Sequence, residues 1–326
     1  MTSSLSASSI PSRNYRIRLF SNFDTPEKVK KSLEHTFCAN NNPYYGDDGD
    51  DGDEKDKKVY FTTDDDYTHA IIFNTEMPRL RNDIPKSRVV GLAYEPNYPA
   101  PFLNVSSTFV EYAKRFIGKY YIGDTRGLPE PFVDGYAYIT YSRPKWNCTD
   151  APIPRPITET NTKLISIMIS QKMFAPGHVY RHRLVREILR LNLPVDIYGR
   201  GCVLYKNTEY ANDPRFKGSF QEYEPYESYK FHIAIENIES NYYFSEKIIN
   251  PLLAGAIPVY LGCRNIREFF GDSVILMENN MEKDIQLITD IVRHPEKYMQ
   301  SRTIDVVAVE ERVNLIKNVD RIFKLD

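Results

Sequence analysis

The stretch 229-YKFHIAIENIESNYYFSEKIINPLLAGAIPVYLG-262 decides the fold of this chain. An apolar run at 231–235 is followed by a polar loop, a helical segment, Gly255 and a second apolar run at 257–261. Strand, loop, helix and strand within about 34 residues form one βαβ unit of a parallel sheet. Such sheets bind ligands beyond the carboxyl ends of their strands. We therefore expect the polar residues between the first strand and the helix to form a binding site.

Four polar side chains lie in this loop or in the first turn of the helix: Asn237, Tyr243, Glu246 and Lys247. The helix macrodipole disfavours a cation in the first turn, so Lys247 indicates an anionic ligand in front of it. Glu246 can accept from two sugar hydroxyls, Asn237 both donates and accepts, and Tyr243 offers a flat face and a hydroxyl. A diphosphate between a ribose and a hexose would use all four.

The same residues also fit an ordinary capped helix with Ser245 as N-cap, Glu246 in the first turn and Lys247 solvated. Spacing alone leaves both interpretations open. Pro251 weakens a continuous helix because it has no N–H and clashes with the carbonyl four residues earlier. We expect the helix to kink at Pro251, or to begin at Asn250 with Pro251 at its first position.

The order of these residues resembles the signature of a known family. Glu236-Asn237, Tyr243 six residues later, Ser245-Glu246-Lys247 and 256-AIPVYLG-262 are similar to the α-1,3/4-fucosyltransferases of glycosyltransferase family 10, with the spacing of the bacterial members. The resemblance covers most of residues 88–300. It implies an α/β chain with the GT-B fold, in which two Rossmann-like domains face an interdomain cleft. It also implies an inverting transfer of L-fucose from GDP-fucose to a hydroxyl of an acceptor glycan, with an α-1,3 linkage to a GlcNAc-type sugar.

A second candidate site residue follows the apolar segment 88-RVVGLAY-94. This segment is typical of a buried strand, and it ends at Glu95 before the turn 96-PNYP-99. A carboxylate with an ordinary pKa of about 4.3 is ionised at neutral pH and can accept a proton. A surface glutamate at a turn fits the same pattern. The family carries its catalytic base after such a strand, so the resemblance implies that Glu95 is the base.

The segment 163-KLISIMIS-170 is apolar on both faces, as buried parallel strands are. It begins a region that resembles the donor-binding part of the family, which implies that Ser170 contacts the donor and that Arg181 or Arg183 binds its diphosphate. Residues two apart on a helix point about 200° apart, so only one arginine can face the phosphate, and we favour Arg181. Either arginine could instead be a solvated helix charge. Gln171 departs from the asparagine that the family has there.

The chain has 326 residues, which is enough for two domains. We place the boundary in the proline-rich segment near 150–160, giving an acceptor-side domain at 1–155 and a nucleotide-sugar domain at 156–326. Residues 1–12 and 40–58 are expected to be disordered because their polar composition cannot bury enough apolar area. The last helix of the chain is expected to pack across both domains.

Composition excludes several other classes. The formal charge of −2 gives no basic footprint, so nucleic acid is not an expected partner. The four cysteines are scattered, which argues against a zinc site or a disulfide scaffold and indicates a reducing compartment. No apolar run reaches the roughly 18 residues of a membrane span, and the N-terminus lacks the apolar core of a signal peptide. We expect a cytoplasmic protein with no transmembrane segment.

Metal-binding patterns are weak in this sequence. Asp64-Asp65-Asp66 loosely matches the Asp-x-Asp motif of other sugar-nucleotide transferases, but it precedes a strand, so we interpret it as a charged loop. His178 and His182 lie four apart without a third ligand. We expect no required cofactor: GDP-fucose is the donor substrate, an oligosaccharide or glycan is the acceptor, and a divalent metal is at most stimulatory.

Two other functions remain open. The same frame could use another GDP- or UDP-sugar, because a fold does not fix the donor. It could also be a glycan- or nucleotide-binding protein without catalysis. The presence of Glu95, Lys247 and the arginine pair together favours an enzyme.

Overall fold

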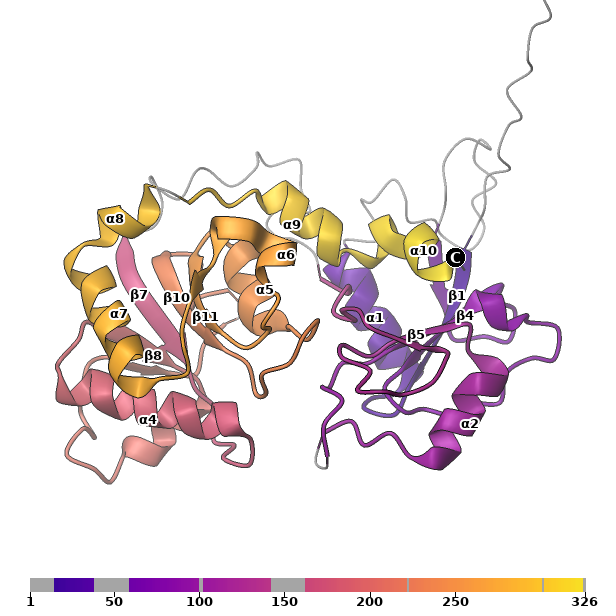
Figure 1. Cartoon of the computed structure of the whole chain (residues 1–326), viewed down its shortest axis with the longest axis horizontal. Helices are drawn as coiled ribbons and strands as arrows, with labels where there is room; N and C mark the ends of the chain where they lie inside the picture. Colours follow the sequence, from indigo (N-terminus) through magenta and orange to yellow (C-terminus); the bar gives the residue numbers. More distant parts are fainter. Residues whose placement is uncertain are drawn as a thin grey trace, which may run out of the picture.

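The structure is a computed structural model that describes residues 15–37, 59–99, 102–141, 162–221, 223–300 and 302–324. The described residues form two α/β domains, each built around a six-stranded sheet whose paired strands are all parallel (Figure 1). The expected α/β architecture with two Rossmann-like domains is therefore present. The disorder expected for residues 1–12 and 40–58 lies outside the described residues.

The first sheet has the strand order β2-β1-β3-β4-β5-β6. Helix α2 covers one face of this sheet, and α1 and α10 cover the other. The chain order reverses between β1 and β3, because β2 pairs on the outer side of β1 while β4 to β6 continue beyond β3. The elements of this domain are β1 (Tyr15–Ser21), α1 (Pro26–Thr36), β2 (Val59–Thr62), β3 (His69–Phe73), η2 (Lys86–Arg88), β4 (Val89–Leu92), α2 (Ser107–Phe116), β5 (Lys119–Tyr121), β6 (Phe132–Val133) and α10 (Leu315–Phe323).

The second sheet has the order β12-β11-β10-β7-β8-β9. Counted along this half of the chain, this is the 3-2-1-4-5-6 order of dinucleotide-binding folds, and it reverses between β7 and β10. Its strands are β7 (Lys163–Met168), β8 (Val195–Tyr198), β9 (Phe216–Gly218), β10 (Tyr229–Ile235), β11 (Ile257–Leu261) and β12 (Ile275–Leu276). Its helices are α4 (Pro176–Arg190), η4 (Arg200–Tyr205), α5 (Glu246–Leu253), α6 (Arg267–Phe270), η5 (Gly271–Ser273), α7 (Met281–Arg293), α8 (Pro295–Met299) and α9 (Val306–Val313).

Helices cover both faces of the second sheet, which explains why its central strands are apolar throughout. Helices α4 and α7 pack on one face through Leu184, Ile188 and Ile288. Helices α5, α6 and α9 pack on the other face. The βαβ unit expected from the sequence is confirmed as β10, α5 and β11, with β10 and β11 paired directly.

Helix α5 begins at Glu246, not at Asn250 as one of our expectations had it. Ser245 is its N-cap, and its side chain accepts a hydrogen bond from the backbone N–H of Lys247 at 3.4 Å. Pro251 lies inside the helix and removes only one backbone donor there. The cap therefore decides where the helix begins, and the proline does not.

The chain end returns to the first domain (Figure 1), but the last helix does not pack in the cores of both domains as expected. Val309 and Val313 of α9 pack in the core of the second domain, whereas α10 packs in the core of the first. The segment 314–324 thus joins the first domain, although the boundary expected from the sequence assigned it to the second. Among the described residues, no helix is both long and apolar enough to span a membrane.

Candidate active site

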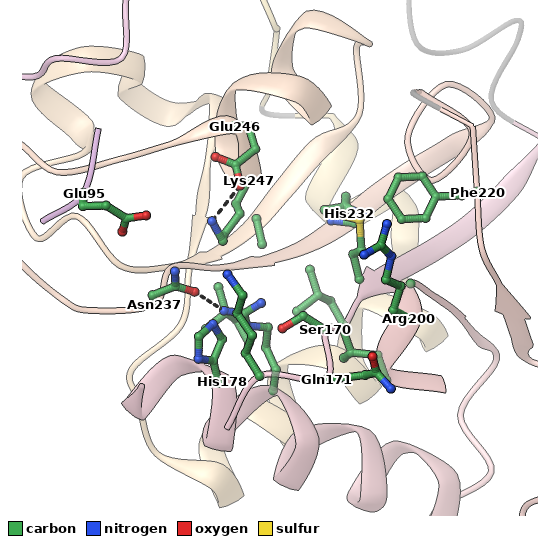
Figure 2. A pocket seen from close by; sticks show the side chains of 18 of the residues that line it. Glu95, Ser170, Gln171, His178, Arg200, Phe220, His232, Asn237, Glu246 and Lys247 are labelled. Atoms are coloured by element: carbon green, nitrogen blue, oxygen red, sulfur yellow. Dashed lines mark hydrogen bonds and ion pairs between the residues drawn. The ribbon is translucent and has the colours of Figure 1, made fainter. Parts of the chain in front are cut away.

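A cavity of about 460 Å³ lies where the strand order of the second sheet reverses. The ends of β7 and β10 and the N-terminal turns of α4 and α5 form most of its wall, and the first domain contributes Glu95 and Tyr138. Figure 2 shows the Glu95 carboxylate directed towards Lys247 and Asn237 across this space. The cavity therefore joins side chains of both domains at the position where parallel sheets bind ligands.

The N-terminus of α4 lies directly against the end of β10. The backbone N–H of Gly177 donates to the carbonyl of Asn237 at 3.0 Å. A Cβ at Gly177 would lie 1.8 Å from the carbonyl oxygen of Glu236, so only glycine permits this approach. The contact brings the positive end of a 15-residue helix to the cavity.

Of the two candidate arginines, Arg181 lines the cavity and Arg183 does not. Arg181 is only 6% exposed, donates from Nε to the carbonyl of Gly177 at 3.1 Å, and donates from Nη2 to Oδ1 of Asn237. Burial lowers the pKa of Arg181, and Glu236 and Glu246 partly offset this effect. Arg183 is exposed and lines a separate cavity beside Glu239. The preference for Arg181 matches this placement.

Lys247 is held among carboxylates and is not solvated. Its Nζ lies 2.8 Å from Oε1 of Glu246 and 3.7 Å from Oε2 of Glu236, and it donates to Oγ of Ser245 at 3.1 Å. Burial opposes its charge, but the two carboxylates outweigh burial and raise the pKa of Lys247. Burial likewise opposes ionisation of Glu246, but Lys247 outweighs it and lowers the pKa of that carboxyl. The capped-helix interpretation is right about Ser245 and wrong about the solvation of Lys247.

Glu236 belongs to the signature, but the sequence reasoning gave it no role; it lies beside Lys247 without lining the cavity. It is 2% exposed and accepts hydrogen bonds from the backbone N–H of Ser245 at 2.8 Å and from its Oγ at 2.7 Å. Burial raises the pKa of Glu236, and Lys247 partly offsets this. A carboxylate directly after a fully apolar strand was the available signal, because such a group needs nearby donors.

Glu95 lies on the loop after β4, and its neighbours fix its backbone. The N–H of Tyr94 donates to Oδ1 of Asn74 at 2.9 Å, and the hydroxyl of Tyr138 donates to the carbonyl of Tyr94. Asn97 Nδ2 donates to the carbonyls of residues 124 and 125 at 3.1 Å each. Burial raises the pKa of Glu95, and the charge of Lys247 partly offsets this. A carboxyl with a raised pKa is a better proton acceptor than an ordinary one.

The remaining expected site residues also line the cavity. Tyr243 is 4% exposed, and its ring packs edge-on against Tyr138 at 6.2 Å between centroids. Burial holds the pKa of Tyr243 well above its ordinary value, so its hydroxyl stays protonated. Ser170 follows β7, and its buried Oγ has no hydrogen-bond partner among the described residues. An unpaired buried hydroxyl at a cavity wall is suited to bind a ligand.

Further residues line the cavity that the sequence analysis did not name as candidates. Arg200, Phe220 and His232 lie at the end of the cavity away from Glu95 (Figure 2). Burial lowers the pKa of His232 to about 3, so it is neutral, and its Nδ1 lies 2.8 Å from Oγ of Ser166. Lys172 adds a cation near Glu95 and Lys247. These residues come from separate loops and strands that only the folded sheet brings together.

The histidine pair is structural. His178 Nδ1 accepts a hydrogen bond from the backbone N–H of Ala175 at 3.2 Å, and His182 Nε2 lies 2.8 Å from the carbonyl oxygen of Ser170. Burial lowers the pKa of His178 to about 4, which keeps it neutral. Within the described ranges, no group of three or more His, Cys, Asp or Glu side chains could hold a metal ion.

Residues 158–301 match the family model described as glycosyltransferase family 10 (fucosyltransferase), C-terminal. Residues 158–301 of this chain belong to glycosyltransferase family 10. The matched segment contains the second sheet and every cavity residue except those of the first domain. The signature around Glu236 and Lys247 lies within this matched segment.

Relatives match over part of their length. The chain is 30% identical over 125 residues to the GDP-fucose protein O-fucosyltransferase 3 of Xenopus laevis, covering 37% of this chain and 26% of that protein. It is 32% identical over 94 residues to the α-(1,3)-fucosyltransferase B of Drosophila melanogaster, covering 27% of this chain and 20% of that protein. The chain thus spans well under two thirds of the length of these relatives.

Solved structures match over nearly the whole chain. A crystal structure of an α1,3-fucosyltransferase with GDP has a TM-score of 0.52 at 14% identity, covering 99% of this chain and 95% of that chain. An α-glucosyltransferase in complex with UDP has a TM-score of 0.53 at 12% identity, covering 95% of this chain and 100% of that chain. At these identities the likeness shows the fold, which is GT-B.

Proposed function

We propose that this protein transfers L-fucose from GDP-fucose to a hydroxyl of an acceptor glycan, with inversion at the anomeric carbon. The single observation that carries the proposal is the cavity shared by Glu95 of the first domain with Arg181 and Lys247 of the second. It places a proton acceptor opposite one buried and one largely buried cation. That is the arrangement needed to activate a hydroxyl on one side of a sugar and to stabilise a leaving diphosphate on the other.

The diphosphate is assigned to Arg181, Lys247 and the N-terminus of α4. Both cations already carry hydrogen-bond partners, so they are held in place before a ligand binds. A preorganised cation stabilises developing charge without reorganisation, which is often worth about 3 kcal/mol for one donor. Ser170 offers its unpaired Oγ beside them. These groups let the reaction proceed with no required metal ion.

The chemical step follows from this placement. Glu95 removes the proton of the acceptor hydroxyl while that oxygen bonds to the anomeric carbon of fucose. The bond between that carbon and the diphosphate oxygen breaks, and the negative charge that develops on GDP is neutralised by Arg181 and Lys247. The raised pKa of Glu95 strengthens it as a base. We further propose an α-1,3 linkage to a GlcNAc-type sugar, as the family signature indicates.

The other end of the cavity is assigned to the nucleoside. Phe220 offers an aromatic face, and Arg200 and His232 lie beside it (Figure 2). With the guanine ring of the donor at this end and its phosphates at Arg181, the fucose lies towards Glu95. Glu246 is assigned to a ribose or fucose hydroxyl, while Asn237 and Tyr243 bound the donor pocket.

The test is turnover of labelled GDP-fucose on a panel of defined oligosaccharides, with wild type and Glu95→Gln. We expect transfer by the wild type and a loss of at least about a hundredfold in Glu95→Gln, with GDP affinity preserved. Unchanged transfer in the variant rejects the base role. Calorimetric titration with GDP and with UDP separates this donor from another nucleotide sugar. Nucleotide binding by a wild type that transfers no sugar supports the non-catalytic alternative.

A further inference from the structure

The first sheet has a reversal point of its own, and a second cavity lies there. The order of its strands reverses between β1 and β3, and ligands of parallel sheets bind beyond the strand ends at such points. A cavity of about 300 Å³ is lined by Phe23 and Asp24, which follow β1, and by α1 residues. We call it the α1 cavity. It is distinct from the donor cavity, with which it shares no lining residue.

The walls of the α1 cavity combine aromatic faces with polar groups. Phe23, Tyr94, Tyr141 and Tyr223 supply the rings. The rings of Phe23 and Tyr94 stack with 5.8 Å between centroids, yet Phe23 remains 51% exposed. An aromatic ring half exposed beside a cavity can stack on a ligand there. The polar groups on the same wall are Asp24, Lys28, Ser32, Thr36, Thr140 and Asn250.

The polar groups are suited to hydroxyls. Asp24 accepts from the N–H of Thr25 at 2.9 Å and lies 3.1 Å from Lys28 Nζ, and both contacts use Oδ1. Its Oδ2 has no partner within the described part of the chain and can accept from a ligand. Carboxylate, amide and hydroxyl groups around aromatic faces suit a sugar ring, whose C–H faces stack on aromatics while its hydroxyls form hydrogen bonds.

The α1 cavity and the proposed catalytic base Glu95 are connected along the chain, because a neighbour of Glu95 lines that cavity. Tyr94 lines the α1 cavity, and the next residue, Glu95, lines the donor cavity. Tyr94 also stacks on Tyr138 of the donor cavity, with 5.0 Å between ring centroids. Consecutive residues thus line the two cavities, and neighbouring sugars of one oligosaccharide are the ligand that would occupy both.

We propose that the α1 cavity binds a second sugar ring of the acceptor glycan, with Phe23 as the stacking platform and Asp24 as a hydroxyl acceptor. This inference rests on the proposed function, because it gives the acceptor a place next to Glu95. The cavity then selects acceptors that carry at least two sugars over single monosaccharides.

The test uses saturation-transfer NMR with GDP present and three probes: N-acetyllactosamine, N,N′-diacetylchitobiose and lacto-N-neotetraose. In the wild type we expect contacts to at least two rings of one probe. Phe23→Ala should remove contacts to one ring and weaken binding of that probe about tenfold, the loss of one stacking contact. Asp24→Asn should weaken it in the same direction. Met77→Ala is the matched control, since Met77 is 46% exposed in the same domain and does not line the cavity.

Two results overturn the inference. One is a wild type that gives no saturation transfer to any of the three probes. The other is a Phe23→Ala protein whose ring contacts and affinity equal those of Met77→Ala. GDP titration of each protein separates this failure from failure of the proposed function. Normal GDP affinity with unchanged sugar contacts in Phe23→Ala removes only the α1 cavity assignment, whereas absent GDP binding in the wild type removes the donor site.

Discussion

Oε2 of Glu236 lies 3.7 Å from Nζ of Lys247, a side chain in the first turn of α5. Glu236 directly follows β10 and Lys247 lies in the first turn of α5, so the pair links the strand and the helix of one βαβ unit. Because Glu236 also accepts both hydrogen bonds from Ser245, it holds the helix cap and the cation at once. The proposed phosphate site therefore depends on a buried carboxylate behind it.

Replacing Glu236 tests this dependence. Glu236→Ala leaves the N–H and hydroxyl of Ser245 without their acceptors in a buried place, so the free energy of unfolding should fall by about 1–3 kcal/mol. Glu236→Gln keeps one acceptor oxygen and should recover part of the loss. Urea denaturation measures both. Glu239→Ala, at a partly exposed position on the following loop, should change the free energy by at most about 0.5 kcal/mol. Equal effects at the two positions would contradict the prediction.

The two arginines of α4 provide a matched pair for the phosphate assignment. Arg181→Met should weaken GDP binding about 10- to 100-fold, the loss of a charge-assisted contact. Arg183→Met should leave it unchanged because Arg183 faces another cavity. Calorimetric titration with GDP measures both, and Lys247→Ala should also weaken binding. If Lys247→Ala bound GDP as tightly as wild type, or if both arginine variants lost affinity equally, the phosphate site would be misassigned.

The pH dependence of transfer should report Glu95. A base must be deprotonated, so kcat/KM should rise with pH through the pKa of Glu95, which burial raises above its ordinary value. Lys172 lowers that pKa, so Lys172→Met should move the acid limb of the profile to higher pH. Lys206→Met, at an exposed position outside the cavity wall, serves as the control. A limb that stays in place, or moves to lower pH, in Lys172→Met argues against Glu95 as the titrating base.

Gly177 sets the distance between α4 and β10. Gly177→Ala would place a methyl group 1.8 Å from the carbonyl oxygen of Glu236, so the helix must move away. We expect a loss of about 1–3 kcal/mol in the free energy of unfolding, together with weaker GDP binding because Arg181 moves with the helix. Thermal unfolding with and without GDP measures both effects. A variant with wild-type stability and affinity would show that this contact does not position the site.

The sequence by itself predicted the central strands of the second sheet, their parallel order and most residues of the proposed donor site. The run from β10 to β11 could be read because a buried parallel strand is apolar throughout and a polar loop must separate it from the next helix. Ser170, Asn237, Tyr243, Glu246 and Lys247 follow strand ends or begin helices, and such positions converge at one edge of a parallel sheet. The helix period also indicated that only one of Arg181 and Arg183 can face the site.

Tertiary structure alone decided the rest. Glu95 comes from the other domain, about 150 residues before Lys247 in the chain. No local sequence pattern shows that the two residues line one cavity. Phe220 and Arg200 line the same cavity as Glu95 through packing between elements distant in sequence. The α1 cavity likewise forms where α1 and the loops after β1 and β4 meet Tyr223 and Asn250 of the second domain. The local pattern of apolar and polar residues decides which residues form a helix or a strand, because its period matches the backbone geometry of that element. Long-range packing decides which helices and strands meet.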